Sequence, residues 1–140
     1  MKTLHLLLAA VLSLGAAQAV AQRLPVPIVN HEGVAVQRGD GKPLVAADVK
    51  KAILVAAEAT GRKWIVTEPT PGRLLATYHV RTHTVTTEIH YSAAQFSVSY
   101  SSSVNMKYAP GPDGKGVIHP FYNQWVQEFV QAIRGELART

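Results

Sequence analysis

The chain has 140 residues, of which 47% are hydrophobic and 16% are charged, and it contains no cysteine. This length fits one domain. The missing cysteine excludes disulfides, thiolate catalysis, cysteine-ligated zinc and a lipid anchor on an N-terminal cysteine. The formal net charge is +5, but the basic residues are scattered and no aromatic residues are interleaved with them, so we expect no nucleic-acid groove.

The first residues are typical of a cleavable secretory signal peptide, which we place at residues 1–21. A positive charge at Lys2 precedes an apolar run over residues 4–14, and small residues follow up to Ala21. We expect cleavage after Ala21, with Ala19 as the alternative. An uncleaved anchor helix is the competing interpretation, but the run is shorter than the roughly 20 residues that span a bilayer. The mature protein is therefore expected to be periplasmic or secreted, with no transmembrane segment after cleavage.

Residues 22–46 are predicted to form an extended N-terminal arm that lies over the domain or is partly free. Pro25 and Pro27 favour extended backbone because proline fixes φ and lacks an amide donor. Gly33 and the glycines that follow it favour turns. The apolar segment 34–36 between them is short for a strand.

Residues 47–140 are predicted to form a single α+β domain that begins and ends with a helix. Asp48 is a suitable N-cap for the first helix because its carboxylate can accept the free amides of the first turn, and Gly61 ends that helix after Thr60. The second helix is expected to begin at Pro120, which suits a first turn. Its apolar stripe consists of Tyr122, Trp125, Phe129, Ile133 and Leu137.

Between the two helices, the spacing of apolar residues changes to two, which is typical of strands. Short turn sequences divide this region into four predicted strands, at residues 63–68, 73–79, 82–91 and 95–101. Strands joined by short turns predict a four-stranded antiparallel meander with one polar face. The N-terminal and the C-terminal helix would then be packed on its other, apolar face.

Three stretches of the chain resemble a known family. The first is residues 71–83, the second reads YSSSVNMKY at residues 100–108, and the third reads IHPFYNQWV at residues 118–126. The last two fit a Y-x-x-S-x-N-[LM]-x-Y and I-H-x-x-Y-N-x-W signature. The chain is thus similar, over roughly residues 45–138, to an uncharacterised family of small exported Gram-negative bacterial proteins, many of them predicted lipoproteins. The resemblance implies an envelope location and one α+β domain, but no activity, and the chain lacks the cysteine of the lipoprotein members.

Six polar side chains in the last two of these stretches are candidates for a structural clasp or a ligand pocket. They are Tyr100, Ser103, Asn105, His119, Tyr122 and Asn123. The preferred interpretation is a clasp between Asn105 and the turn at residues 119–123. His119 is expected to cap the second helix or orient the loop before it, and the hydroxyl of Tyr122 is expected to bond a sheet residue.

His79 and His83 flank the predicted turn between the second and third strands. If the hairpin places them on one face, their imidazoles could share a zinc or copper ion. No Asp or Glu stands at ligand spacing beside them, and surface histidines are the competing interpretation.

Taken together, these features predict a small exported, non-enzymatic binding or interaction protein whose partner is an envelope protein or a ligand. No cofactor is expected. A periplasmic metal-binding protein that uses His79 and His83 is the alternative. A hydrolase around Ser103, Asn105 and His119 is a third hypothesis, although the chain has no G-x-S-x-G elbow, and side-chain bonds at a polar strand end also explain the serines.

Overall fold

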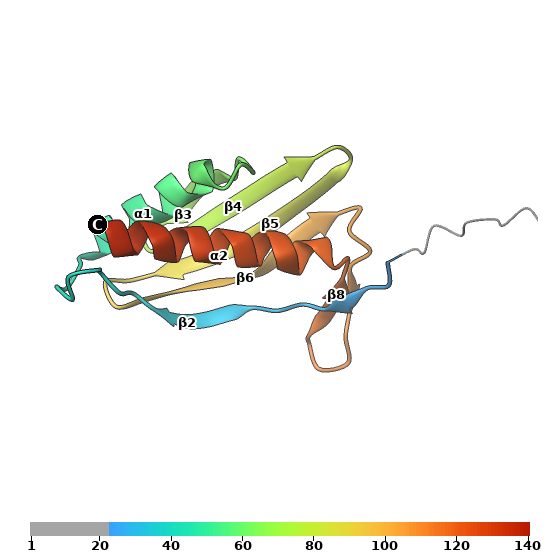
Figure 1. Cartoon of the computed structure of the whole chain (residues 1–140). Helices are drawn as coiled ribbons and strands as arrows, with labels where there is room; N and C mark the ends of the chain where they lie inside the picture. Colours follow the sequence, from blue (N-terminus) through green and yellow to red (C-terminus); the bar gives the residue numbers. More distant parts are fainter. Residues whose placement is uncertain (1–22) are drawn as a thin grey trace, which may run out of the picture.

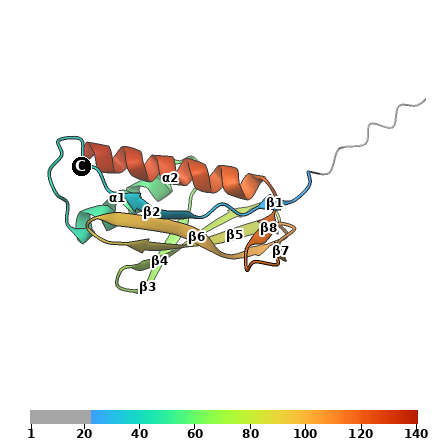
Figure 2. The same cartoon turned by 90° about the horizontal axis from the view of Figure 1, so that it is seen from below.

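The computed structural model describes residues 23–140, so the predicted signal peptide and both cleavage positions lie outside the described residues. Two helices lie on one side of a five-stranded antiparallel sheet, and a small three-stranded sheet stands at one end (Figures 1 and 2). The fold is therefore α+β. The elements in chain order are β1 (Val26–Pro27), β2 (His31–Ala35), α1 (Ala46–Ala59), β3 (Ile65–Thr70), β4 (Arg73–Val80), β5 (His83–Tyr91), β6 (Gln95–Val104), β7 (Ala109–Pro110), β8 (Gly116–Ile118) and α2 (Phe121–Arg139).

The four strands expected from the sequence are present as β3, β4, β5 and β6, joined in an antiparallel meander. The prediction that the sheet has four strands is wrong, because β2 from the N-terminal arm pairs with β6 and gives the order β2-β6-β5-β4-β3. A second sheet, in the order β1-β8-β7, was not predicted at all.

The arm at residues 22–46, expected to lie over the domain or be partly free, supplies an edge strand to each sheet. Its strand β2 was hidden in the sequence by a break in the pattern: the register shifts between His31 and Val34, and Gly33 has a φ of +56°. Glycine adopts such a left-handed conformation without the strain that a side chain would bring. The bulge therefore interrupts the two-residue alternation that identifies a strand.

The N-cap of the first helix lies three residues earlier than predicted. Val45 is its N-cap, and Asp48 stands at the third helical position, where its carboxylate accepts the backbone N–H of Val45 at 3.2 Å. The prediction that Asp48 is the N-cap is thus wrong, although an acidic side chain in the first turn still stabilises the helix dipole. The second helix begins at Phe121, one residue later than expected, with Pro120 as its N-cap.

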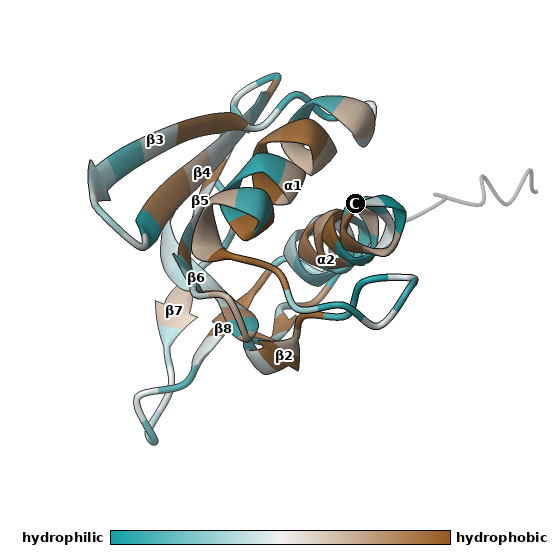
Figure 3. Ribbon diagram, turned by 90° about the vertical axis from the view of Figure 1, so that its left-hand side faces the viewer, coloured by the Kyte–Doolittle hydropathy of each residue, from teal (hydrophilic) through white to brown (hydrophobic). Residues whose placement is uncertain are grey.

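The core lies between the helices and the sheet face turned toward them, as the apolar colouring of the facing surfaces shows (Figure 3). The strand periodicity explains which face is buried: side chains at alternate positions, such as Leu74 and Ala76, point to the helices. Thr87 is the one fully buried polar residue within residues 23–140. None of the helices in that range is long and apolar enough to cross a bilayer.

Candidate functional site

The hairpin between β4 and β5 separates the two histidines that were candidates for a shared metal ion. His83 stands opposite Val80, the immediate neighbour of His79. Because side chains alternate across a strand, His83 points to the helix side of the sheet and His79 to the open side. His79 Nδ1 lies 3.0 Å from the hydroxyl of Thr84 on that open side. The structure does not bring the pair together, and no group of three or more His, Asp and Glu residues gathers within residues 23–140.

His83 is instead held next to the segment that follows β6. Its Nδ1 lies 2.7 Å from the backbone carbonyl oxygen of Asn105. A carbonyl oxygen can only accept, so Nδ1 carries the proton and donates it. Asn105 itself has a φ of +57°, and its side-chain amide donates to the hydroxyl of Thr82 at 2.9 Å. This closes the β4–β5 turn against the end of β6.

His119 stands immediately before α2 and caps its first turn, as one of the two roles expected for it. Its Nδ1 accepts the backbone N–H of Phe121 at 3.1 Å, and the backbone N–H of His119 donates to the carbonyl oxygen of Met106 at 2.8 Å. The prediction of a clasp between Asn105 and the turn at residues 119–123 is therefore wrong: Asn105 bonds His83 and Thr82, and the start of α2 is joined instead to the backbone of Met106.

These two histidines line one cavity of about 80 Å³, the histidine pocket, which is formed by His83, Met106, His119, Phe121 and Trp125. Met106 and Trp125 are buried, with 3% and 7% of their surface exposed. The ring centres of His119 and Phe121 are 4.8 Å apart, and those of Phe121 and Trp125 are 5.7 Å apart. The walls are thus a thioether and two aromatic rings, and the polar groups are two imidazoles.

Positive charge surrounds the pocket. The guanidinium carbon of Arg23 lies 4.5 Å from the centre of the Phe121 ring, and the ammonium of Lys107 donates to the carbonyl oxygen of Arg23 at 3.4 Å. Within residues 23–140, neither cation forms an ion pair with a carboxylate. Burial, followed by the charges of Lys107, Arg23 and His83, lowers the pKa of His119. His119 is therefore neutral near pH 7, and the surroundings disfavour further positive charge.

Three other predicted site residues, Tyr100, Ser103 and Tyr122, are linked through the side chain of Tyr100. The hydroxyls of Tyr100 and Ser103 lie 2.9 Å apart, and the Tyr100 ring meets the Tyr122 ring edge-on at 5.6 Å between centres. Tyr122 is fully buried, but the prediction that its hydroxyl bonds a sheet residue is wrong, because no atom within residues 23–140 is its hydrogen-bond partner.

Asn123 contacts the arm and not Asn105. Its side-chain oxygen accepts the backbone N–H of Val29 at 3.0 Å, and its side-chain nitrogen donates to the carbonyl oxygen of Pro27 at 2.9 Å. The amide thereby fixes the arm between β1 and β2 to the first turn of α2. No local sequence pattern predicts this contact, because Val29 and Asn123 are 94 residues apart in the chain.

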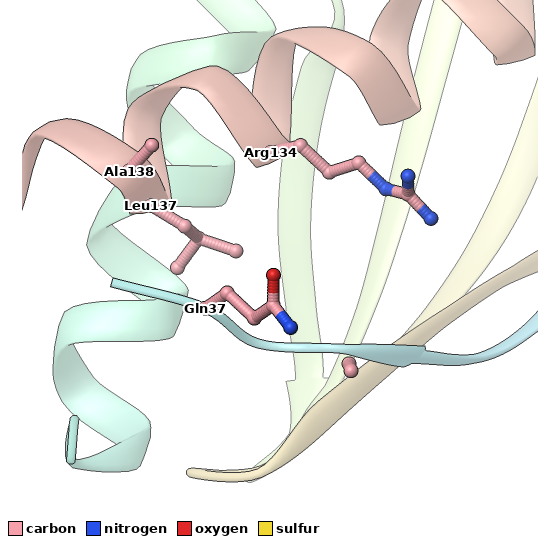
Figure 4. A pocket seen from close by; sticks show the side chains of 5 residues that line it. Gln37, Arg134, Leu137 and Ala138 are labelled. Atoms are coloured by element: carbon pink, nitrogen blue, oxygen red, sulfur yellow. The ribbon is translucent and has the colours of Figure 1, made fainter. Parts of the chain in front are cut away.

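Larger hollows exist at the opposite end of α2, where the chain between β2 and α1 passes the helix. One of about 320 Å³ is lined by Ala35, Gln37, Arg134, Leu137 and Ala138 (Figure 4). Its polar side chains, Gln37 and Arg134, are exposed. They project from two different segments, and no hydrogen bond within the described chain fixes either of them. Since a binding site needs polar groups held in place, the smaller histidine pocket is the better candidate.

No known protein family matches the chain, and no curated protein or solved structure is similar enough to match it.

Sequence reasoning missed the apolar walls of the pocket and the pairing of His83 with His119. Met106, Phe121 and Trp125 stand in the two signature stretches, which was the available signal. Trp125 was correctly expected in the core. The register of the β4–β5 hairpin turns His83 toward the helix side, where His119 lies. That register is set by the geometry of the turn, which the sequence shows only indirectly.

Proposed function

We propose that this chain is a small exported, non-enzymatic binding protein and that the histidine pocket is its ligand site. One observation carries the proposal: two imidazoles from distant segments are fixed by backbone atoms at Asn105 and Phe121 around a single cavity. Each ring keeps its second nitrogen, Nε2, without a hydrogen-bond partner within residues 23–140. Polar groups fixed in this way among apolar walls are typical of small-molecule sites.

The bonding of the neighbouring hydroxyls favours binding over catalysis. A nucleophilic serine needs a histidine within hydrogen-bond reach. Ser103 is bonded to Tyr100 instead, and the hydroxyl of Thr82 accepts from Asn105. Within the described range, neither His83 nor His119 bonds to a hydroxyl group.

Export to the envelope is part of the same proposal and is supported by the charged, apolar and small-residue segments of residues 1–21. The resemblance to exported Gram-negative proteins agrees with it. The intact mass of the protein from an envelope fraction tests it: the expected mass corresponds to a chain that begins at Gln22 and carries no acyl group. A full-length mass would contradict export with cleavage.

The ligand site is tested by NMR of the ¹⁵N-labelled mature protein against a library of small organic acids, amides, amines and alcohols. Binding is expected to shift the ring signals of His83 and His119 and the indole signal of Trp125. The ring signals of His79 and His90, on the open face of the sheet, should stay in place. If no compound moves the pocket signals, the pocket is not a ligand site.

The same spectra recorded with Zn²⁺ and Cu²⁺ test the metal-binding alternative. We expect no binding in the pocket, because His119 already uses its Nδ1 lone pair to accept from Phe121, and a metal would need the Nε2 that then carries the proton. Stoichiometric broadening of both His83 and His119 signals would favour the metal site.

A further inference from the structure

The hydrogen-bond partner of Nδ1 in His83 and in His119 fixes which tautomer each histidine adopts. His83 must donate from Nδ1 because its partner is the carbonyl oxygen of Asn105, so its Nε2 has a lone pair and accepts. His119 must accept at Nδ1 because its partner is the N–H of Phe121, so its Nε2 carries the hydrogen and donates. The pocket thus offers one hydrogen-bond acceptor, from the start of β5, and one donor, from the segment before α2.

The charge around the pocket selects the sign of the ligand. Arg23 stands over Phe121, and Lys107 follows Met106 directly in the chain. Both lack a carboxylate partner within residues 23–140. The first turn of α2 adds the positive end of the helix dipole. An anion is favoured at this position, and an ammonium group is disfavoured.

The cavity limits the size of the ligand. At about 80 Å³, it has roughly half the volume of a 150 Å³ cavity that is known to hold benzene. A ligand of the size of lactate therefore fills the pocket and extends past its partly exposed histidines, and a sugar ring or a peptide side chain with its backbone is too large. Met106, Phe121 and Trp125 provide apolar contacts for a short carbon chain.

We infer that the histidine pocket binds a small 2-hydroxycarboxylate, with the carboxylate at His119 Nε2–H and the hydroxyl donating to His83 Nε2. This inference rests on the proposed ligand site and adds the chemical class of its ligand. Arg23 and Lys107 balance the charge of the carboxylate, and the apolar walls cover the carbon chain.

Related small molecules satisfy only part of the pocket. A simple carboxylate leaves His83 Nε2 without a donor, and a neutral hydroxyamide leaves the cations uncompensated. An amino acid brings an ammonium group toward Arg23 and Lys107. Inorganic phosphate needs more donors than two histidines and the apolar walls provide.

The experiment is an NMR titration of the mature protein with matched probes: lactate, propionate, lactamide, alanine and inorganic phosphate. Lactate is expected to bind tightest. Propionate, which lacks the hydroxyl, should bind about fivefold more weakly, which is the ratio for one neutral hydrogen bond. Lactamide, which lacks the charge, should bind about tenfold more weakly, since charge-assisted bonds are roughly twice as strong.

Three variants assign the two contacts to their residues. His83→Asn keeps an N–H for the Asn105 carbonyl, but its shorter side chain places no acceptor at the position of Nε2, so the affinity for lactate should fall to that for propionate and the affinity for propionate should not change. His119→Asn keeps an oxygen that accepts from Phe121, but its shorter side chain places no donor at the position of Nε2, so the affinity for both acids should fall about tenfold. His79→Asn, on the open face, is the matched control and should change neither.

Lys107→Gln gives a second route if a pocket variant does not fold, because Lys107 is exposed. This substitution should reduce the ratio of the affinity for lactate to that for lactamide, and added salt should then lower the affinity for lactate by less than in the parent protein.

The outcomes separate this inference from the proposed function. If no probe moves the signals of His83, His119 and Trp125, the 2-hydroxycarboxylate class is overturned, and the proposed ligand site falls with it only if the wider library also moves none of these signals. If lactamide or alanine binds as tightly as lactate, the preference for an anion is wrong and the ligand site remains. If propionate equals lactate, the hydroxyl contact is wrong. If phosphate binds tightest, the carboxylate class is wrong.

Discussion

At the scale of single residues, Tyr122 places a polar atom in the middle of the core. Its hydroxyl is buried without a hydrogen-bond partner within residues 23–140, and burial raises the pKa of the phenol. A buried polar group without a partner costs about 1–3 kcal/mol. We expect Tyr122→Phe to keep or raise the free energy of unfolding in urea. The control Tyr100→Phe removes a bond to Ser103 and should lower it by about 1 kcal/mol. A comparable loss in both variants would contradict the assignment.

The carboxyl group of Glu88 makes the free energy of unfolding depend on pH in the acid range. Hydrogen bonds from Arg73 at 2.9 Å and His90 at 2.6 Å hold the pKa of the Glu88 carboxyl at about 2, below its ordinary 4.5. The folded state therefore binds this proton less readily than the unfolded state. The stabilisation is present above pH 4.5 and is lost as the pH falls toward 2.

Glu88→Gln should accordingly lower the free energy of unfolding at pH 7, by up to about 1 kcal/mol because the carboxylate is partly exposed. The difference from the parent protein should shrink below pH 4.5 and vanish near pH 2. Urea unfolding across this range measures it. Glu58→Gln, on the exposed side of α1, is the control. A difference that is constant with pH would show that the effect is not electrostatic.

At the scale of elements, one side chain of α2 holds the segment of the arm between β1 and β2. Asn123 holds both Val29 and Pro27, and the adjacent Ile28 donates its N–H to Gly116 in β8. Asn123→Ala should cost about 1–2 kcal/mol and speed hydrogen exchange at Val29 and Ile28 more than in β5. Gln124→Ala, on the solvent side of the same turn, should do neither. Equal acceleration across the whole sheet would mean that the arm and the sheet open together.

The elements also show where the sequence was informative. The strands β4 to β6 were predicted because each buries alternate side chains and each is bounded by turn residues. The strand β3 buries none of its side chains fully and was predicted from the dense turn that follows it. The strands β1, β7 and β8 have only two or three residues each, too few for a period to be seen. Their pairing depends on long-range contacts, such as that of Asn123 with the arm, which no local pattern encodes.

The candidate site was predictable only in parts. His119 was expected either to cap α2 or to orient the loop before it; its ring accepts the N–H of Phe121 in the first turn, although the N-cap residue is Pro120. The prediction that His83 and His79 lie on the same face was wrong, because their spacing in the sequence does not determine which side chains share a face until the register of the hairpin is known. The pocket itself needs β5, the end of β6 and α2 to meet, so it is a property of the tertiary structure.

At the scale of the whole molecule, an aromatic cluster joins α2 to the sheet. Phe129 is fully buried and stacks on Trp64, with ring centres 5.0 Å apart and planes 12° apart. Trp64 in turn lies 5.5 Å from Tyr78 of β4, and Tyr78 lies 5.2 Å from Trp125. The chain contains two tryptophans, both in this cluster, so intrinsic fluorescence reports the packing of α2 on the sheet.

Phe129→Ala should therefore cost about 3–5 kcal/mol, the usual loss for a buried phenylalanine, which is a large share of the 5–15 kcal/mol of a typical domain. Because helices and sheet share this core, circular dichroism and fluorescence should report one coincident urea transition, moved to lower urea. The control Leu54→Ala, at a site that is 39% exposed on α1, should shift it by no more than about 0.5 kcal/mol. A fluorescence transition that precedes the loss of secondary structure would show that α2 detaches before the sheet unfolds. The histidine pocket, which α2 closes, would then open at a lower urea concentration than the one that unfolds the sheet.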